Sequence, residues 1–390
     1  MNQRFYSLDV FRGATVALMI LVNNPGSWDA IYQPLEHAPW NGCTPTDLVF
    51  PFFLFAVGNA LAFVMHRPEN GGSRNFLFKV VKRTISIFAI GLFLNWFPFV
   101  RWADGRLAPK YWVNPQNLEN GIRILGVLQR IALCYGLASL IIYFLKIKGA
   151  FVLSVAVLLG YWVLCLVLGH RPDPFGMQGY FGLPIDKAVL GIAHMYKGEG
   201  TPFDPEGIAS TLPAIVQVIF GFFAGNYILE KGKTYEMVSN LFVAGCVLVF
   251  VGFCWDMVFP INKKIWSSSF VVYTSGIAML LLSVLIHVIE FHKWRGGWSR
   301  FFDVFGKNPL FIFVLSGLIP RFLGLIRWQD GTTSNGGISY TTPLEWFYEQ
   351  VCKPISENQK NGSLLFAIIT VLFFWLIAYC LDRRKIYLRV

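Results

Sequence analysis

The chain has 390 residues, of which 55% are hydrophobic and only 14% are charged, and its formal net charge is +11. Because a soluble protein has about 25% charged residues, this chain has too few polar side chains to face water on all sides. Its apolar segments are about 20 residues long, the length that crosses a bilayer as a helix. The composition therefore excludes an ordinary soluble protein and predicts an all-α, polytopic membrane helical bundle.

About ten transmembrane helices are expected from the apolar pattern. They cover residues 8–24, 46–66, 78–99, 122–145, 149–168, 208–229, 236–258, 267–289, 303–325 and 362–381. The segment 303–325 is the weakest, because two prolines interrupt it. No repeat or change of composition divides the chain, so residues 1–390 are treated as a single transmembrane domain.

The distribution of Lys and Arg predicts the orientation, because these residues are enriched at the cytoplasmic ends of spans. With both termini in the cytoplasm, more than half of the 33 Lys and Arg residues fall at inner ends. Topology thus explains most of the positive charge, and no nucleic-acid partner is expected. Some of these cations could also hold a phosphorylated ligand.

Three long segments join spans on the outer side, at about 100–121, 169–207 and 326–361. They are rich in Gly, Pro and aromatic residues. They could form a lid over an outward-facing site. Their aromatic side chains could equally form an interfacial belt.

One histidine, His37, lies just outside the membrane between the first two predicted spans. Imidazole is the side chain best able to exchange a proton near neutral pH, so His37 is a candidate for chemistry at the membrane face. Asp47 opens the second span after a Thr-Pro pair, as a capping carboxylate does. Because it lies ten residues from His37, it could instead orient the imidazole, and both roles stay open.

Polar residues also occur where the bilayer makes them expensive. Asp9 and Arg12 share one face at the inner start of the first span and could form a local ion pair. Asn23 and Asn24 end that span on the outer side, where they could cap the helix or contact a ligand.

The fourth span carries two arginines. Arg123, Gly126 and Arg130 share one helical face, and Gln129 is adjacent. Arginine within a span is costly and marks either a function or a buried partner. An ion pair with Asp9 or Asp47 is the structural alternative, and Arg130, the deeper arginine, is the stronger functional candidate.

Several motifs together resemble the heparan-α-glucosaminide N-acetyltransferase family. In chain order they are Ser-Leu-Asp-Val-Phe-Arg-Gly (7–13), His-Ala-Pro-Trp-Asn-Gly (37–42), Thr-Asp-Leu-Val-Phe-Pro-Phe-Phe (46–53), Ile-Leu-Gly-Val-Leu-Gln-Arg (124–130), Phe-Asp-Pro-Glu-Gly (203–207), Pro-Ile-Asn-Lys-Lys-Ile-Trp (260–266) and Gly-Lys-Asn-Pro (306–309). The resemblance is to the shorter bacterial branch, which lacks the luminal N-terminal domain of the lysosomal enzyme.

This resemblance implies transmembrane acetylation at a bacterial inner membrane. Acetyl-CoA binds from the cytoplasm, and its acetyl group reaches the amine of glucosamine or a short glucosaminide on the periplasmic side. The family's essential histidine matches His37, and its first-span asparagine matches Asn23, with Asn24 as a rival. Asn24, Trp40 and Asn41 are then the expected sugar contacts.

The charges of acetyl-CoA should keep its nucleotide end at the inner face. The residues assigned to the cofactor are Arg12, Lys82, Arg83, Gln129, Arg130, Lys307 and Asn308. Only the pantetheine arm would enter the bundle, past Gly13, Gly58 and Gly126, unless these glycines serve close helix packing.

In the implied mechanism, His37 is the general base or carries the acetyl group itself. Asn23 donates to the carbonyl oxygen and Asp47 holds the imidazole tautomer. No metal is expected, because the cysteines and histidines lack metal-ligand spacing. A homodimer is a candidate assembly. The alternatives are an amino-sugar transporter and an O-acetyltransferase of surface glycans.

Overall fold

The computed structural model describes residues 5–66, 72–103, 105–332 and 338–388, and most of them are helical. The longer helices are α1 (Tyr6–Asn23), α2 (Val49–Met65), α3 (Gly72–Trp96), α4 (Val127–Leu168), α6 (Ile208–Lys231), α7 (Tyr235–Asp256), α8 (Ser268–Ile286), α9 (Gly297–Lys307), α10 (Pro309–Leu323) and α12 (Gln359–Arg383). The shorter ones are α5 (Gly182–Leu190), α11 (Pro343–Phe347), η1 (Gln33–Leu35), η2 (Pro45–Leu48), η3 (Ile192–His194), η4 (His287–Phe291), η5 (Tyr348–Cys352) and η6 (Lys353–Ile355).

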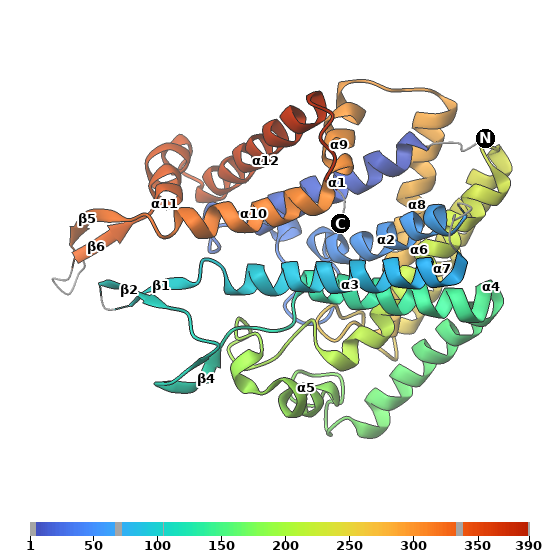
Figure 1. The fold of residues 1–390 in the computed structure, drawn as a ribbon, viewed down its shortest axis with the longest axis horizontal. Coiled ribbons are helices and arrows are strands. Elements are labelled where there is room, and N and C mark those ends of the chain that lie inside the picture. Colours follow the sequence, from blue (N-terminus) through green and yellow to red (C-terminus); the bar gives the residue numbers. More distant parts are fainter. Residues whose placement is uncertain (1–4, 67–71, 104, 333–337, 389–390) are drawn as a thin grey trace.

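Three antiparallel hairpins extend from one end of the bundle (Figure 1). They pair β1 (Val100–Ala103) with β2 (Arg106–Pro109), β3 (Val113–Asn114) with β4 (Asn117–Gly121), and β5 (Trp328–Thr332) with β6 (Ile338–Thr341). All three lie within or beside the long connecting segments expected on the outer side. We call this end of the molecule the hairpin end.

Within the described residues, seven helices are long and apolar enough to cross a membrane, or eight if the bent pair of α9 and α10 is one span. The pair bends by 81° where Pro309 lacks the N–H needed to continue the helix. A polytopic membrane bundle is thus confirmed, with fewer qualifying helices than the ten predicted. One reason is that α3 carries Lys79, Lys82 and Arg83 in its first half, which lowers its hydropathy.

The other reason is that α4 is continuous over 42 residues and covers two predicted segments. Its backbone leaves the helical region at Lys146, where φ is 57°, a conformation that a side chain with a Cβ rarely adopts. Figure 1 shows the second half of α4 turning back toward the hairpin end. The turn lies between the predicted segments 122–145 and 149–168.

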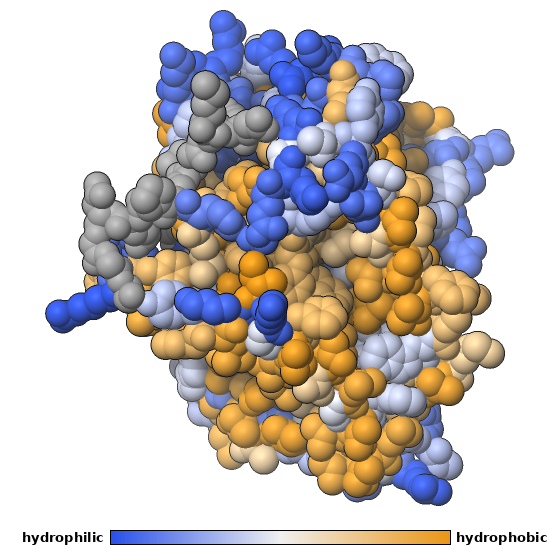
Figure 2. All heavy atoms as spheres, turned by 90° about the vertical axis from the view of Figure 1, so that its right-hand side faces the viewer, coloured by the Kyte–Doolittle hydropathy of each residue, from blue (hydrophilic) through white to orange (hydrophobic). Residues whose placement is uncertain are grey.

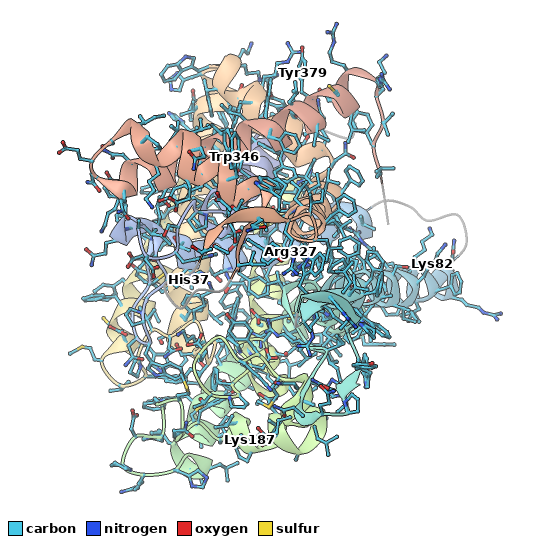
Figure 3. The ribbon with its side chains drawn as sticks, turned by 90° about the vertical axis from the view of Figure 1, so that its left-hand side faces the viewer. His37, Lys82, Lys187, Arg327, Trp346 and Tyr379 are labelled. Carbon is cyan, nitrogen blue, oxygen red and sulfur yellow. The ribbon has the colours of Figure 1, made fainter. Side chains whose placement is uncertain are left out.

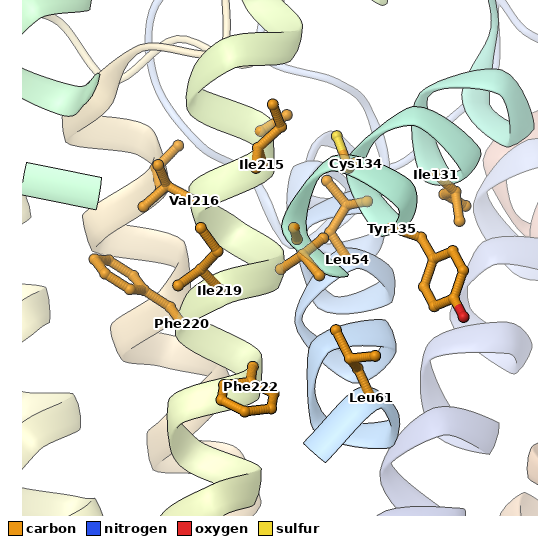
Figure 4. Close-up of a cluster of buried hydrophobic side chains, with 14 of the residues drawn as sticks. Leu54, Leu61, Ile131, Cys134, Tyr135, Ile215, Val216, Ile219, Phe220 and Phe222 are labelled. Carbon is orange, nitrogen blue, oxygen red and sulfur yellow. The ribbon is translucent and has the colours of Figure 1, made fainter. Parts of the chain in front are cut away.

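The central core forms where α2, α4 and α6 meet (Figure 4). It is built from aliphatic and aromatic side chains such as Leu54, Leu61, Ile131, Tyr135, Ile215, Ile219 and Phe222. Helix α6 is the most buried candidate span, with 83% of its window inside the protein, against 28% for α7. The exposed side chains of α7 include Val247, Phe250 and Phe253, as expected for a helix that faces lipid.

Glycines bring the central helices into backbone contact. A Cβ added to Gly58 of α2 would lie 1.9 Å from the carbonyl oxygen of Val218, and one added to Gly221 of α6 would lie 2.0 Å from that of Phe55. Gly13 of α1 is equally close to Phe302 of α9. Of the two roles considered for Gly13 and Gly58, the structure therefore supports close packing.

Figure 2 views the molecule from the end opposite the hairpins. Apolar side chains cover much of the middle and lower part of this face, and hydrophilic side chains gather at the top.

Candidate active site

The candidate site begins with the loop 24–44, which joins α1 to α2. The Thr44 hydroxyl donates to the carbonyl oxygen of Glu36 at 2.6 Å, which closes the loop on itself. The backbone N–H of Gly42 donates to the carbonyl oxygen of Ile261 at 2.7 Å, which holds the loop against the connection between α7 and α8. Figure 3 shows His37 near the middle of the hairpin end.

His37 and Asp47 are in direct contact, as the sequence suggested. His37 Nδ1 lies 2.7 Å from Asp47 Oδ1. The other carboxylate oxygen accepts from the backbone N–H of Ala38 at 3.1 Å and from the backbone N–H and hydroxyl of Thr44 at 3.0 and 3.1 Å. Asp47 thus caps η2, which leads directly into α2, and orients His37 at once.

The two side chains differ strongly in exposure, which is 46% for His37 and 2% for Asp47. Because an ionised carboxylate can only accept, the contact places the imidazole proton on Nδ1. The lone pair is then on Nε2, where it can take a proton or attack a carbonyl carbon.

Lys263, a residue that was not expected at the site, contacts both His37 and Asp47. Its Nζ lies 3.1 Å from His37 Nδ1, 3.5 Å from His37 Nε2 and 3.4 Å from Asp47 Oδ1. Burial lowers the pKa of Lys263 below that of an ordinary lysine. The motif 260–266 was visible in the sequence, but nothing in its spacing indicated a contact with a residue 226 positions away.

The neighbours of His37 that were expected to bind sugar have structural partners. The indole N–H of Trp40 donates to the carbonyl oxygen of Phe175 at 3.0 Å. The side-chain oxygen of Asn41 accepts from Asn262 at 3.1 Å. These bonds tie the His37 loop to the segment 169–207 and to the connection between α7 and α8, and Asn41 stays exposed.

The two asparagines at the end of α1 behave differently. Asn24 donates its side-chain amide to the carbonyl oxygen of Ile20 at 2.8 Å, so this amide caps its own helix. Asn23 is exposed at the last residue of α1.

The arginines of the predicted fourth span have partners other than Asp9 or Asp47. Arg123 forms ion pairs with Asp204, at 2.5 Å, and with Glu206. Burial opposes its charge, but these two carboxylates raise the pKa of Arg123. Both acids belong to the motif 203–207, which sequence reasoning noted without assigning its charges.

Arg130 is 1% exposed and lies one turn inside α4. Its guanidinium donates to the carbonyl oxygen of Gly207 at 2.9 Å and to the hydroxyl of Ser210, and its Cζ lies 5.2 Å from the centre of the Trp266 ring. Within the described part of the chain, its Nε and Nη1 are buried without a hydrogen-bond partner. The side-chain amide of the adjacent Gln129 donates to the carbonyl oxygen of Ile124 at 2.9 Å.

The remaining residues assigned to the cofactor lie in two other places. Arg12 is paired with Asp9, and α1 packs there against α9, because a Cβ on Gly306 would lie 2.0 Å from the Asp9 carbonyl oxygen. Lys307 lies 2.8 Å from Asp303 and 3.0 Å from Asp382.

The last residues assigned to the cofactor are Asn308, Lys82 and Arg83. Asn308 donates to the carbonyl oxygen of Ile386 and accepts from the N–H of Leu388, so it fastens the C-terminal segment. Lys82 and Arg83 are exposed on α3, and Lys82 lies well to the side of His37 in Figure 3.

Comparisons of the sequence with a family model and with curated proteins point to the same family. Residues 4–253 match the family model described as heparan-alpha-glucosaminide N-acetyltransferase, catalytic. Two similar curated proteins are the heparan-alpha-glucosaminide N-acetyltransferases of Homo sapiens and Mus musculus, 26% and 24% identical over 441 and 440 aligned positions. Each alignment covers 99% of this chain, which spans 60% of the length of either relative. The family match includes His37 and Arg130 and ends before Lys263.

Proposed function

The chain belongs to the heparan-alpha-glucosaminide N-acetyltransferase catalytic family, and on this basis we propose that it is a transmembrane N-acetyltransferase. It transfers the acetyl group of acetyl-CoA to the amine of glucosamine or a short glucosaminide across a bacterial inner membrane. The observation that carries the proposal is the contact of the half-exposed His37 with the buried Asp47.

The proposed topology has ten crossings, with both termini in the cytoplasm. It counts α3 as a span despite its basic first half, and it counts α4 twice because of the turn at Lys146. His37 and the three hairpins then face the periplasm, while the turn of α4 and the ends of α2 and α6 face the cytoplasm. The positive-inside distribution of Lys and Arg supports this orientation.

A cavity at the cytoplasmic ends of α2 and α6 and the turn of α4 suits the nucleotide end of acetyl-CoA. It measures about 510 Å³, and its lining combines apolar and basic side chains with one amide and one carboxylate: Met65, His66, Ile142, Lys146, Ile147, Lys148, Phe222, Asn226 and Glu230. Among the described residues no carboxylate forms an ion pair with Lys146 or Lys148. Arg12 and Lys307, by contrast, are already neutralised. The two lysines are therefore better placed to bind phosphate.

The length of the pantetheine arm fits this placement. Ile142 in the cavity wall and Arg130 are twelve residues apart on the first half of α4, which is about 18 Å along the helix axis. The arm spans roughly 15–20 Å when extended. A nucleotide in the cavity therefore lets the thioester reach the level of Arg130, whose unpaired Nε and Nη1 can donate to carbonyl oxygens of the arm.

At the outer end, His37 makes the acceptor amine nucleophilic. Its Nε2 takes a proton from the amine as the nitrogen attacks the thioester carbonyl carbon, or it carries the acetyl group first. Asp47 keeps the imidazole proton on Nδ1 throughout. Asn23, whose rival Asn24 already caps α1, is the asparagine available to donate to the carbonyl oxygen.

The decisive experiment is acetyl transfer by purified protein in detergent. Acetyl-CoA and glucosamine are supplied, thiol release is followed, and the product is analysed by mass spectrometry and base treatment. An amide-linked acetyl group that requires His37 supports the proposal. A base-labile ester would instead indicate an O-acetyltransferase, and absence of glucosamine-dependent CoA release would favour a transporter.

A further inference from the structure

We propose that Lys263 is a catalytic residue of the His37 centre, where its ammonium group stabilises the negative charge that develops on the thioester oxygen. This assignment rests on the proposed function, because it needs an acyl carbonyl at His37. Sequence reasoning assigned this role to Asn23 alone. Lys263 lies in the motif 260–266, beyond the residues 4–253 that match the family model but inside the alignments with the two curated relatives.

The backbone that carries Lys263 is fixed by the buried residue before it. Asn262 is fully buried, and its side-chain oxygen accepts from the N–H of Ile265 at 3.0 Å. Its own backbone N–H donates to the hydroxyl of Ser267, also at 3.0 Å. The side-chain amide of Asn262 reaches Asn41 in the His37 loop. These bonds fix the backbone at Lys263, and the ion pair with Asp47 at 3.4 Å holds its ammonium group before a substrate arrives, which is what electrostatic stabilisation requires.

The distances place this charge beside the reacting atoms. Lys263 Nζ is 3.5 Å from His37 Nε2, the nitrogen that carries the lone pair and that faces the ammonium group. An acyl carbon approached by Nε2, or by an amine hydrogen-bonded to Nε2, brings its oxygen within a few ångströms of the same point. An ammonium group there can donate to the oxygen as the carbonyl becomes tetrahedral.

The complete step balances without an added reactant. The acceptor amine attacks the carbonyl carbon, and His37 Nε2 takes the proton that the amine loses. The carbonyl electron pair moves onto oxygen beside Lys263, then returns as the carbon–sulfur bond breaks. The departing sulfur takes the proton from Nε2, so that one carbon–nitrogen bond replaces one carbon–sulfur bond, and Lys263 keeps its proton.

The other titratable groups around His37 leave Lys263 and Asp47 as the charges that face it. Lys263 Nζ lies 3.1 Å from His37 Nδ1 and 3.4 Å from Asp47 Oδ1. Burial raises the pKa of Cys43 to about 12, which keeps that thiol neutral. Burial alone would raise the pKa of Glu206, but Arg123 lowers it, so this acid is ionised and committed to the arginine. Lys264 is paired with Glu199. Among the described residues, Lys263 and Asp47 are therefore the charged groups that face the imidazole without another charged partner of their own.

The test compares Lys263→Met and Lys263→Arg with Lys264→Met as a matched control. Lys264 loses the same charge from the same loop, but its amine binds Glu199 and the carbonyl oxygen of Pro39 instead of His37. We expect Lys263→Met to lower kcat by about 100-fold or more, with the KM for acetyl-CoA changed little and the thermal midpoint lowered, because the buried Asp47 loses its cation. Lys264→Met should keep kcat within about threefold of the wild type.

The pH profile separates catalysis from folding. The wild type should lose kcat at alkaline pH as Lys263 loses its proton, and this limb should move to higher pH in Lys263→Arg, because arginine stays protonated. If Lys263→Met does not fold, the shift of the alkaline limb in Lys263→Arg tests the assignment by itself. Wild-type kcat in Lys263→Met, or an unmoved alkaline limb in Lys263→Arg, overturns the assignment. A wild type without acetyl transfer refutes the proposed function instead.

Discussion

Replacing Asp47 with asparagine separates the two roles of this side chain. The carboxylate accepts from His37, from two backbone N–H groups and from the Thr44 hydroxyl. An amide has one oxygen, so Asp47→Asn can keep either the backbone partners or the imidazole. If the oxygen stays with the backbone, the NH₂ group faces His37 Nδ1. The imidazole proton then moves to Nε2 and blocks the base.

The size of the effect follows from these contacts. Hydrogen bonds to a charged group contribute about 1.5–3 kcal/mol each, and the change also leaves Lys263 without its buried counter-ion. Losing one partner of such a pair costs about 3–5 kcal/mol. We expect kcat to fall on the order of 10³–10⁴-fold, as for other histidines held in the wrong tautomer. The thermal midpoint should also fall.

The assay follows thiol release at saturating acetyl-CoA and glucosamine, together with thermal unfolding of the same preparations. Thr44→Val is the control, because it removes one cap hydroxyl and leaves the contact between His37 and Asp47 intact. It should cost about 0.5–2 kcal/mol of stability and keep kcat within about threefold. If Asp47→Asn turns over like the wild type, or if Thr44→Val loses as much kcat, the carboxylate does not act through His37.

Three further outcomes are expected. The double change Lys146→Ala and Lys148→Ala should raise the KM for acetyl-CoA about 10- to 100-fold. The KM for S-acetylpantetheine, which has no nucleotide, should stay unchanged. Equal effects on the two donors would show that the nucleotide binds elsewhere. Burial raises the pKa of Asp186 above that of an ordinary aspartate, to about 6, so its contribution to stability is present below pH 4 and is lost as the pH rises through 6. Thermal midpoints measured from pH 4 to 7 should therefore decline less in Asp186→Asn, and an unchanged slope would contradict this. Arg123→Gln should destabilise the protein by about 2–4 kcal/mol, because Asp204 and Glu206 lose their shared cation. Denaturant titration checks this. If Arg123→Lys is as stable as the wild type, a positive charge alone stabilises Asp204 and Glu206, and the bidentate geometry of arginine is not needed.

The features that were predicted correctly from the sequence depend on residues close together in the chain. Apolar run length located the helical segments, and the spacing of Asp47 after a Thr-Pro pair predicted both the cap and its reach to His37. The turn at Lys146 separates two segments that were expected as separate crossings. These features depend on neighbours within a few turns of chain.

The contacts that were missed are long-range. Lys263 meets His37 across 226 positions, and Arg123 meets Asp204 across 81. No periodicity encodes such pairs. Likewise, Lys307 looked like a free cation at the inner face until the fold brought Asp382 beside it. A charge in a sequence shows that a partner is needed, but the packing of distant helices decides which one.

The backbone contact between α2 and α6 limits how this protein can move. Gly58 and Gly221 leave no side-chain layer between the two helices, so a large tilt of one against the other would have to break these backbone contacts. The cap that holds Asp47 leads directly into this closely packed pair. Transfer of a small group along the bundle, as in the proposed function, would leave the contacts between α2 and α6 in place.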